Sequence, residues 1–155
     1  MLVATLQTDR TAHDRVEECL AGTEIEHVSL PSESVLVAGN EQMRPQIFAA
    51  TLGPQSHGCL QLQHHLRQTD EPLCFVYLDD DAPKEAVVRA MALNAVTILS
   101  HQCTTADLKS ALDVAAAVHQ RRERWISQIR TAQQLLQQLP CRQRDVMTMV
   151  VSGWT

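Results

Sequence analysis

Short apolar runs that alternate with longer amphipathic stretches most restrict how this 155-residue chain can fold. Five runs have the length of a strand, and Pro, Gly or polar residues flank most of them; they cover residues 2–6, 25–30, 47–51, 73–78 and 96–99. Amphipathic stretches lie between them, at residues 12–20, 33–38, 59–67 and 83–93. Because strands and helices alternate, the pattern predicts an α/β fold, a parallel sheet with helices on both faces.

A long segment without Gly or Pro follows these elements, from Ala106 to Leu139. Thr104 or Thr105 can cap its start and Pro140 marks its end, so the pattern predicts one continuous helix. Such a helix is about 50 Å long, which is more than the sheet needs for cover.

The second half of this helix carries five apolar residues at steps of 4, 3, 4 and 3: Trp125, Ile129, Ala132, Leu136 and Leu139. This spacing is typical of the a/d seam of a coiled coil. The seam is about two heptads long, which is shorter than a coiled coil usually needs. A dimer seam and packing against a following domain therefore stay open as alternatives.

Charge is distributed unevenly along the chain. Residues 1–118 hold 16 acidic residues against 7 Lys and Arg, whereas residues 119–155 hold 6 Arg against 2 acidic residues. The change of sign predicts two parts with different partners, the basic part near nucleic acid, with a solvated helix face as the alternative. No apolar run approaches a membrane span and no leader peptide is recognisable. With five scattered cysteines, we expect a cytoplasmic protein with reduced thiols and no membrane contact.

Motifs that would indicate catalysis are missing from the sequence: there is no Gly-rich phosphate loop, nucleophile elbow or His-Glu-x-x-His pair. His57, Cys59, His64 and His65 are ligand types that zinc accepts, but adjacent residues of a helix point about 100° apart. The three aspartates at 79–81 could attract a divalent cation instead. A solvated surface is the alternative for both groups. We therefore expect no enzyme, no cofactor and no bound metal.

Four segments resemble a response regulator. Residues 86–99, AVVRAMALNAVTIL, are similar to the fourth helix, the turn and the fifth strand of a receiver domain. Residues 72–76 resemble its fourth strand, and residues 5–16 resemble its first strand, acidic loop and first helix. Residues 139–155 resemble the opening of a LuxR-type helix-turn-helix, as in FixJ-like and NarL-like transcription regulators. The resemblance covers essentially the whole chain and implies a flavodoxin-like fold with five parallel strands in the order 2-1-3-4-5.

The resemblance also shows where this chain departs from a working receiver, which needs an acid pair for Mg²⁺, an acceptor Asp, a hydroxyl and a Lys. The residues at these positions are Gln7 and Thr8 with Asp9 beside them, Ala50 or Thr51, Tyr77, and His101 followed by Gln102. Mg²⁺ prefers hard oxygen ligands, and an aspartyl phosphate needs a carboxylate. We therefore expect a pseudo-receiver with a degenerate pocket, in which His101 either responds to pH near neutrality or is an ordinary loop residue.

The LuxR-type segment stops at Thr155, before the recognition helix that reads the major groove in this family. Arg142 and Arg144 can contact DNA phosphates, with surface ion pairs as the alternative. We expect a pseudo-receiver at residues 1–118, a linker helix at 119–139 and an incomplete helix-turn-helix at 140–155.

The resemblance implies a regulatory function, with dimerisation or partner binding in place of phosphorylation. The expected partners are a second copy of the chain and a sensor-kinase-like or other regulatory protein. DNA is expected only through a complete C-terminal domain that this chain lacks. The alternative is a stand-alone protein-interaction module that does not bind DNA.

Overall fold

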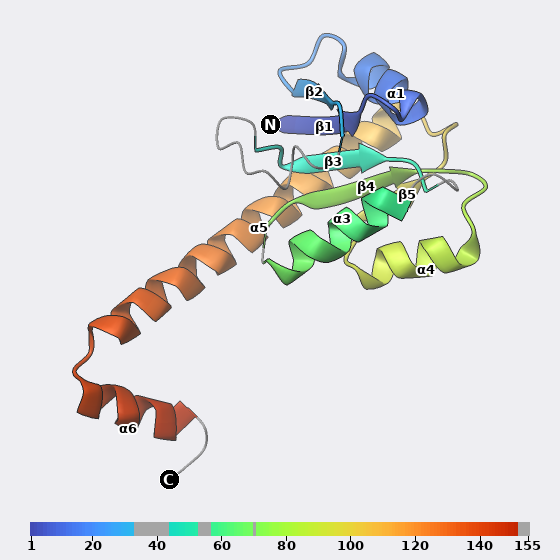
Figure 1. Cartoon of the computed structure of the whole chain (residues 1–155). Coiled ribbons are helices and arrows are strands. Elements are labelled where there is room, and N and C mark those ends of the chain that lie inside the picture. The colour runs from blue at the N-terminus through green and yellow to red at the C-terminus, as the bar shows by residue number, and fades with distance from the viewer. Residues whose placement is uncertain (33–43, 53–56, 70, 152–155) are drawn as a thin grey trace. The chain divides into compact units, whose positions relative to one another are not determined.

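The computed structural model describes residues 1–32, 44–52, 57–69 and 71–151 (Figure 1). The elements in chain order are β1 (Leu2–Leu6), α1 (Arg10–Leu20), β2 (Glu26–Leu30), β3 (Ile47–Ala50), α3 (His57–Gln68), β4 (Cys74–Leu78), α4 (Lys84–Ala92), β5 (Thr97–Leu99), α5 (Thr105–Gln138) and α6 (Cys141–Val151). Each of the five predicted strands is present and agrees with its expected bounds to within one residue at either end.

The strands form one sheet in the order β2-β1-β3-β4-β5, and every neighbouring pair is parallel. This confirms the strand order 2-1-3-4-5 that the family resemblance implies. In the register of the sheet, Ala50 at the end of β3 lies beside Tyr77 of β4, and Tyr77 lies beside Ile98 of β5. Because all strands run in the same direction, the loops that follow them meet at one edge of the sheet.

Two hydrophobic layers hold helices against the sheet. On one face, α1 and α5 pack on inward-facing residues such as Val3, Ile47 and Val76. On the other face, α3 and α4 pack on the alternate residues of the same strands, among them Phe48 and Phe75. Figure 1 shows these two helix pairs on opposite sides of the strands. The strand runs are apolar at nearly every position because a parallel sheet is buried on both faces.

The helices differ slightly from their predicted bounds. Pro83 was expected in the first turn of a helix, whereas α4 begins at Lys84 and Pro83 occupies the cap position before it. Of the two candidate caps of the long helix, Thr104 is the one that accepts the Asp107 backbone N–H, at 3.1 Å. The helix expected at residues 33–38 lies outside the described residues.

The chain divides into two compact units, Met1–Arg121 and Arg122–Thr155. The first contains the sheet, the helices α1, α3 and α4, and the N-terminal half of α5. The second contains the C-terminal half of α5 and α6. In the described part of the chain, no helix combines the length and the apolarity needed to cross a membrane.

Candidate functional site

The edge at which the strands end is the candidate site of the first unit. Asp9 lies just after β1, and one oxygen of its carboxylate caps α1 by accepting the Ala12 backbone N–H at 3.1 Å. The other oxygen accepts the backbone N–H of Thr51 at 2.6 Å. One side chain therefore starts a helix and holds the chain just beyond β3.

Asp79 has the corresponding position after β4. Its Oδ2 accepts the backbone N–H of Leu52 at 3.0 Å, and its Oδ1 accepts that of Asp81 at 2.9 Å. The Asp79 backbone N–H donates in turn to the carbonyl of Leu99 at the end of β5, at 2.8 Å. Asp79 is half-buried, whereas Asp80 and Asp81 are exposed. Hydrogen bonds to an ionised carboxylate are stronger than those between neutral groups, so Asp79 is a second clamp on the segment after β3.

The end of β3 itself carries no acidic side chain. Ala50 is completely buried and Thr51 is half-buried. The backbone amides of Thr51 and Leu52 are held by the carboxylates of Asp9 and Asp79. A methyl group and a hydroxyl therefore occupy the two residues at which the family resemblance places the phosphate acceptor, and neither can form an acyl phosphate.

Tyr77 lies beside Ala50 near this edge, but its side chain belongs to the core. Its side chain is 0% exposed, and its hydroxyl donates to Oε1 of Gln63 on α3 at 2.9 Å. Burial raises the pKa of the phenol well above its usual range. The resemblance predicted this residue at the hydroxyl position after the fourth strand. In the structure Tyr77 is inside β4 and belongs to the core, and the residue that follows the strand is Asp79.

The other predicted pocket residues have different surroundings. Gln7 and Thr8 are exposed, and the Gln7 backbone N–H extends the pairing of β1 with β2 by donating to the Leu30 carbonyl at 2.8 Å. His101 is half-buried in the turn after β5, and its Nδ1 is a buried nitrogen without a hydrogen-bond partner among the described residues. Of the predicted set, the structure brings Asp9 and Thr51 together directly.

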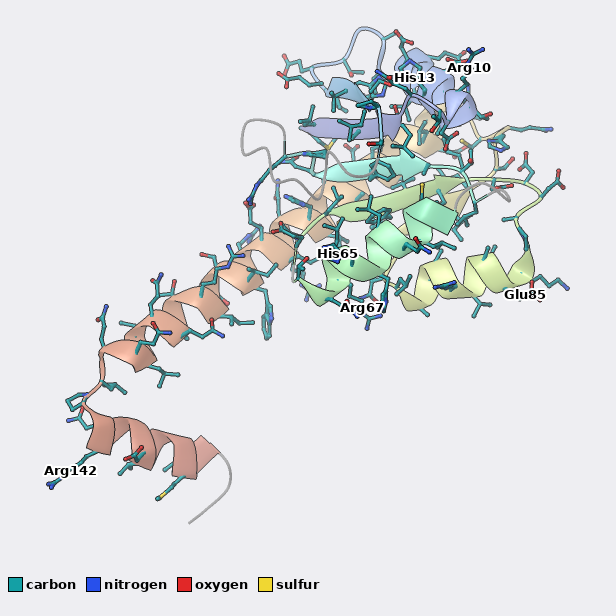
Figure 2. The ribbon with its side chains drawn as sticks, in the orientation of Figure 1. Arg10, His13, His65, Arg67, Glu85 and Arg142 are labelled. Carbon is teal, nitrogen blue, oxygen red and sulfur yellow. The ribbon has the colours of Figure 1, made fainter. Side chains whose placement is uncertain are left out.

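The metal candidates fall on different surfaces. Cys59 is buried in the core under α3, whereas His64 and His65 of the same helix are exposed. Figure 2 shows His65 and Arg67 on α3, on the other side of the sheet from His13. The side chain of His57 lies outside the described part of the chain.

Within the described residues, one group offers three ligand atoms within 4.8 Å of one another, and it consists of His13, Asp14 and Glu17 on α1. This group includes neither the three aspartates at 79–81 nor the described members of the predicted zinc set.

The second unit exposes apolar side chains along α5. The predicted seam is solvent-accessible at Trp125, which is 66% exposed, and at Ile129 and Leu136. Ala132 is also exposed, and Leu139 is half-buried. Leu139 and Val146 contribute apolar surface to an open groove that Arg142 and Gln143 also line.

The predicted phosphate contacts lie on α6. Arg142 is exposed on this helix, where Figure 2 labels it. Arg144 belongs to the same helix, and its side chain lies outside the described residues.

Sequence reasoning missed two polar residues that organise this part of the molecule. Asp79 was assigned to a solvated acidic run, although its position directly after a buried strand matches that of Asp9 after β1. Gln63 lies in the amphipathic stretch at residues 59–67, and no role was predicted for it. In the structure it is 3% exposed and donates to the carbonyls of Ala90 and Leu93, each at 3.2 Å. Its partner, a buried Tyr in the neighbouring strand, is visible only in three dimensions.

The strand order and the helix layers are those of the receiver fold of response regulators. The response regulator StyR is similar in structure, with a TM-score of 0.70 at 17% identity, over 99% of this chain and 78% of that one. The signal receiver domain of a Vibrio parahaemolyticus protein has a TM-score of 0.65 at 11% identity, over 79% and 94%. FixJ-N has a TM-score of 0.63 at 12% identity, over 75% and 93%.

At these identities the similarity concerns the fold. No protein-family model matches the sequence, and no curated protein matches it either.

Proposed function

We propose that this chain is a regulatory pseudo-receiver, a module of a two-component-type transcription regulator that takes no phosphate on an aspartate. The observation that carries the proposal is the pair of clamps at the end of β3. The segment that follows Ala50 is held by Asp9 and Asp79 of the chain itself. A receiver binds its phosphoryl group at this same edge. In this chain the two carboxylates fix the segment after β3 there, and no phosphoryl group is needed.

In this proposal the module acts by dimerisation or by binding a protein partner, such as a sensor-kinase-like protein or another regulator. It thereby controls a LuxR-type DNA-binding domain, of which α6 is the first helix. Arg142, exposed on α6, contacts DNA phosphates, which position a protein on the duplex without reading its sequence. The receiver fold and the basic character of residues 119–155 support this assignment. No catalysis is part of it.

The test is treatment of the 155-residue chain with acetyl phosphate and Mg²⁺, followed by intact-mass measurement. We expect no gain in mass corresponding to one phosphoryl group. A receiver domain that keeps its acceptor aspartate serves as the positive control. A gain of one phosphoryl group that neutral hydroxylamine removes, as expected of an acyl phosphate, would overturn the proposal.

A second candidate function is a stand-alone protein-interaction module. The exposed stripe that contains Trp125, Ile129 and Leu136 favours it, because large apolar side chains gathered on one surface usually mark a contact site. DNA binding by a chain that carries a complete C-terminal DNA-binding domain distinguishes the two functions, since the regulator requires it and the interaction module does not.

A further inference from the structure

One buried hydroxyl connects two histidines in the first unit. Oγ1 of Thr5, a residue of β1 that is 0% exposed, lies 3.2 Å from Nδ1 of His13 on α1 and 2.8 Å from Nε2 of His27 on β2. The two imidazole rings are tilted by 38°, and their centroids are 5.0 Å apart. These three residues therefore join one helix and two strands.

The number of protons on this group decides whether all its hydrogen bonds can form. A threonine hydroxyl donates one proton and can accept others. With both rings neutral, Thr5 donates to one ring nitrogen and accepts the N–H of the other, so both contacts are satisfied. With one imidazolium the arrangement persists. With two, both rings must donate to Oγ1, the hydroxyl proton loses its acceptor, and two positive charges face each other across 5.0 Å.

The carboxylates nearest the pair lie on α1, beside His13. Oε2 of Glu17, on the same helix, lies 3.5 Å from His13 Nε2, and Asp14 offers a carboxylate oxygen within 4.8 Å of the ligand atoms of His13 and Glu17. Strands β1 and β3 contain no charged residue, and β2 contributes only the exposed Glu26 beside His27.

His27 is the less favourable place for a proton. It is half-buried, and desolvation together with the charge of His13 lowers its pKa below the ordinary histidine value, an effect that Glu17 partly offsets.

We propose that Thr5, His13 and His27 form a proton-binding site, in which binding of a second proton releases α1 from β2. The release would reach the edge of the sheet through α1, because its capping residue Asp9 also holds the Thr51 amide. The proposal does not depend on the function proposed above. It adds a pH response, carried by residues far in sequence from the predicted pocket residue His101.

The test is a titration of the imidazole Cε1–H resonances by NMR, between about pH 5 and pH 8, on the 155-residue chain with a chelator present. We expect His27 to titrate below the ordinary histidine range, and its resonance to respond also when His13 titrates. The hydrogen-exchange rates of the α1 backbone amides should rise as His27 gains its proton, after correction for the pH dependence of exchange in an unfolded chain. If the imidazoles of His13 and His27 titrate independently in the wild-type chain, that result alone overturns the proposal.

Two variants sharpen the test. His13→Gln removes one charge, so the titration of His27 should shift upward, toward the ordinary histidine range. His65→Gln, at an exposed position of α3 across the sheet, is the matched control and should leave His27 unchanged (Figure 2). Equal titration of His27 in the two variants would contradict the proposed site. A response that appears only when Zn²⁺ replaces the chelator would do the same, because it would assign the group to metal binding.

Discussion

The hydroxyl of Tyr77 donates a hydrogen bond to Oε1 of Gln63, 2.9 Å away, in the buried layer between β4 and α3. The amide nitrogen of Gln63 donates in turn to the Ala90 and Leu93 carbonyls at the C-terminal end of α4. A single buried glutamine thus connects one strand with two helices. Since buried polar groups are costly when they lack a partner, this connection fixes the position of α4 on the sheet.

Replacing Tyr77 by Phe should destabilise the chain by about 1–3 kcal/mol, because Oε1 of Gln63 then stays buried without a donor. Urea unfolding followed by circular dichroism measures the change in the free energy of unfolding. A double-mutant cycle with Gln63→Leu separates the direct interaction from the separate effects of the two substitutions. A coupling energy of zero would show that the hydroxyl and the amide do not stabilise each other.

Asp9 has two roles that different substitutions separate. Asp9→Asn keeps one oxygen for the cap of α1, but its side-chain NH₂ cannot accept the Thr51 N–H. Asp9→Ala loses both contacts and should cost about 1 kcal/mol more than Asp9→Asn, the usual value of a helix cap. Hydrogen exchange at the Thr51 amide should accelerate in both variants. The exposed Asp80→Asn is the control, and equal exchange rates in Asp80→Asn and Asp9→Asn would refute the clamp.

The start of α5 should make stability depend on pH in the acid range. Asp107 accepts the backbone N–H and the hydroxyl of Thr104, at 3.0 and 2.7 Å, and these hydrogen bonds lower the pKa of its carboxyl. With the folded pKa below the unfolded value of about 3.9, the stabilising contribution is present above that value. It is lost as the pH falls through the folded pKa.

Asp107→Asn should therefore reduce the loss of stability below about pH 4, as measured by urea midpoints at constant ionic strength. Asp113→Asn, an exposed position of the same helix, is the matched control. Acid profiles of the two variants that coincide would rule out a special contribution from Asp107.

The stripe on the second half of α5 predicts the oligomeric state. If it is a dimer seam, Leu136→Glu places charges in an apolar contact, and light scattering should report half of the wild-type mass. Gln134→Glu introduces the same charge at an exposed position outside the seam and should leave the mass unchanged. A mass for Leu136→Glu equal to that of the wild-type chain would assign the stripe to another contact.

The sequence alone determined the secondary structure and its order. Strands buried on both faces leave continuous apolar runs such as residues 74–78, and amphipathic helices leave a 3.6-residue period, so both can be read locally. The absence of an acidic side chain at Ala50 and Thr51 could also be read from the sequence, because only the residue types at these positions matter. Strand order needed more than periodicity, and it was predicted from the resemblance to receivers.

Only the tertiary structure decided which side chains meet. Asp79 clamps Leu52 from 27 positions away, and His27 reaches Thr5 from 22 positions away. Such contacts depend on strand register and on where each helix starts, and neither leaves a local pattern. Sequence similarity placed Tyr77 near the end of β4, and the register of the sheet has it there, beside Ala50. Only the packing against α3 shows that its side chain is buried and donates to Gln63.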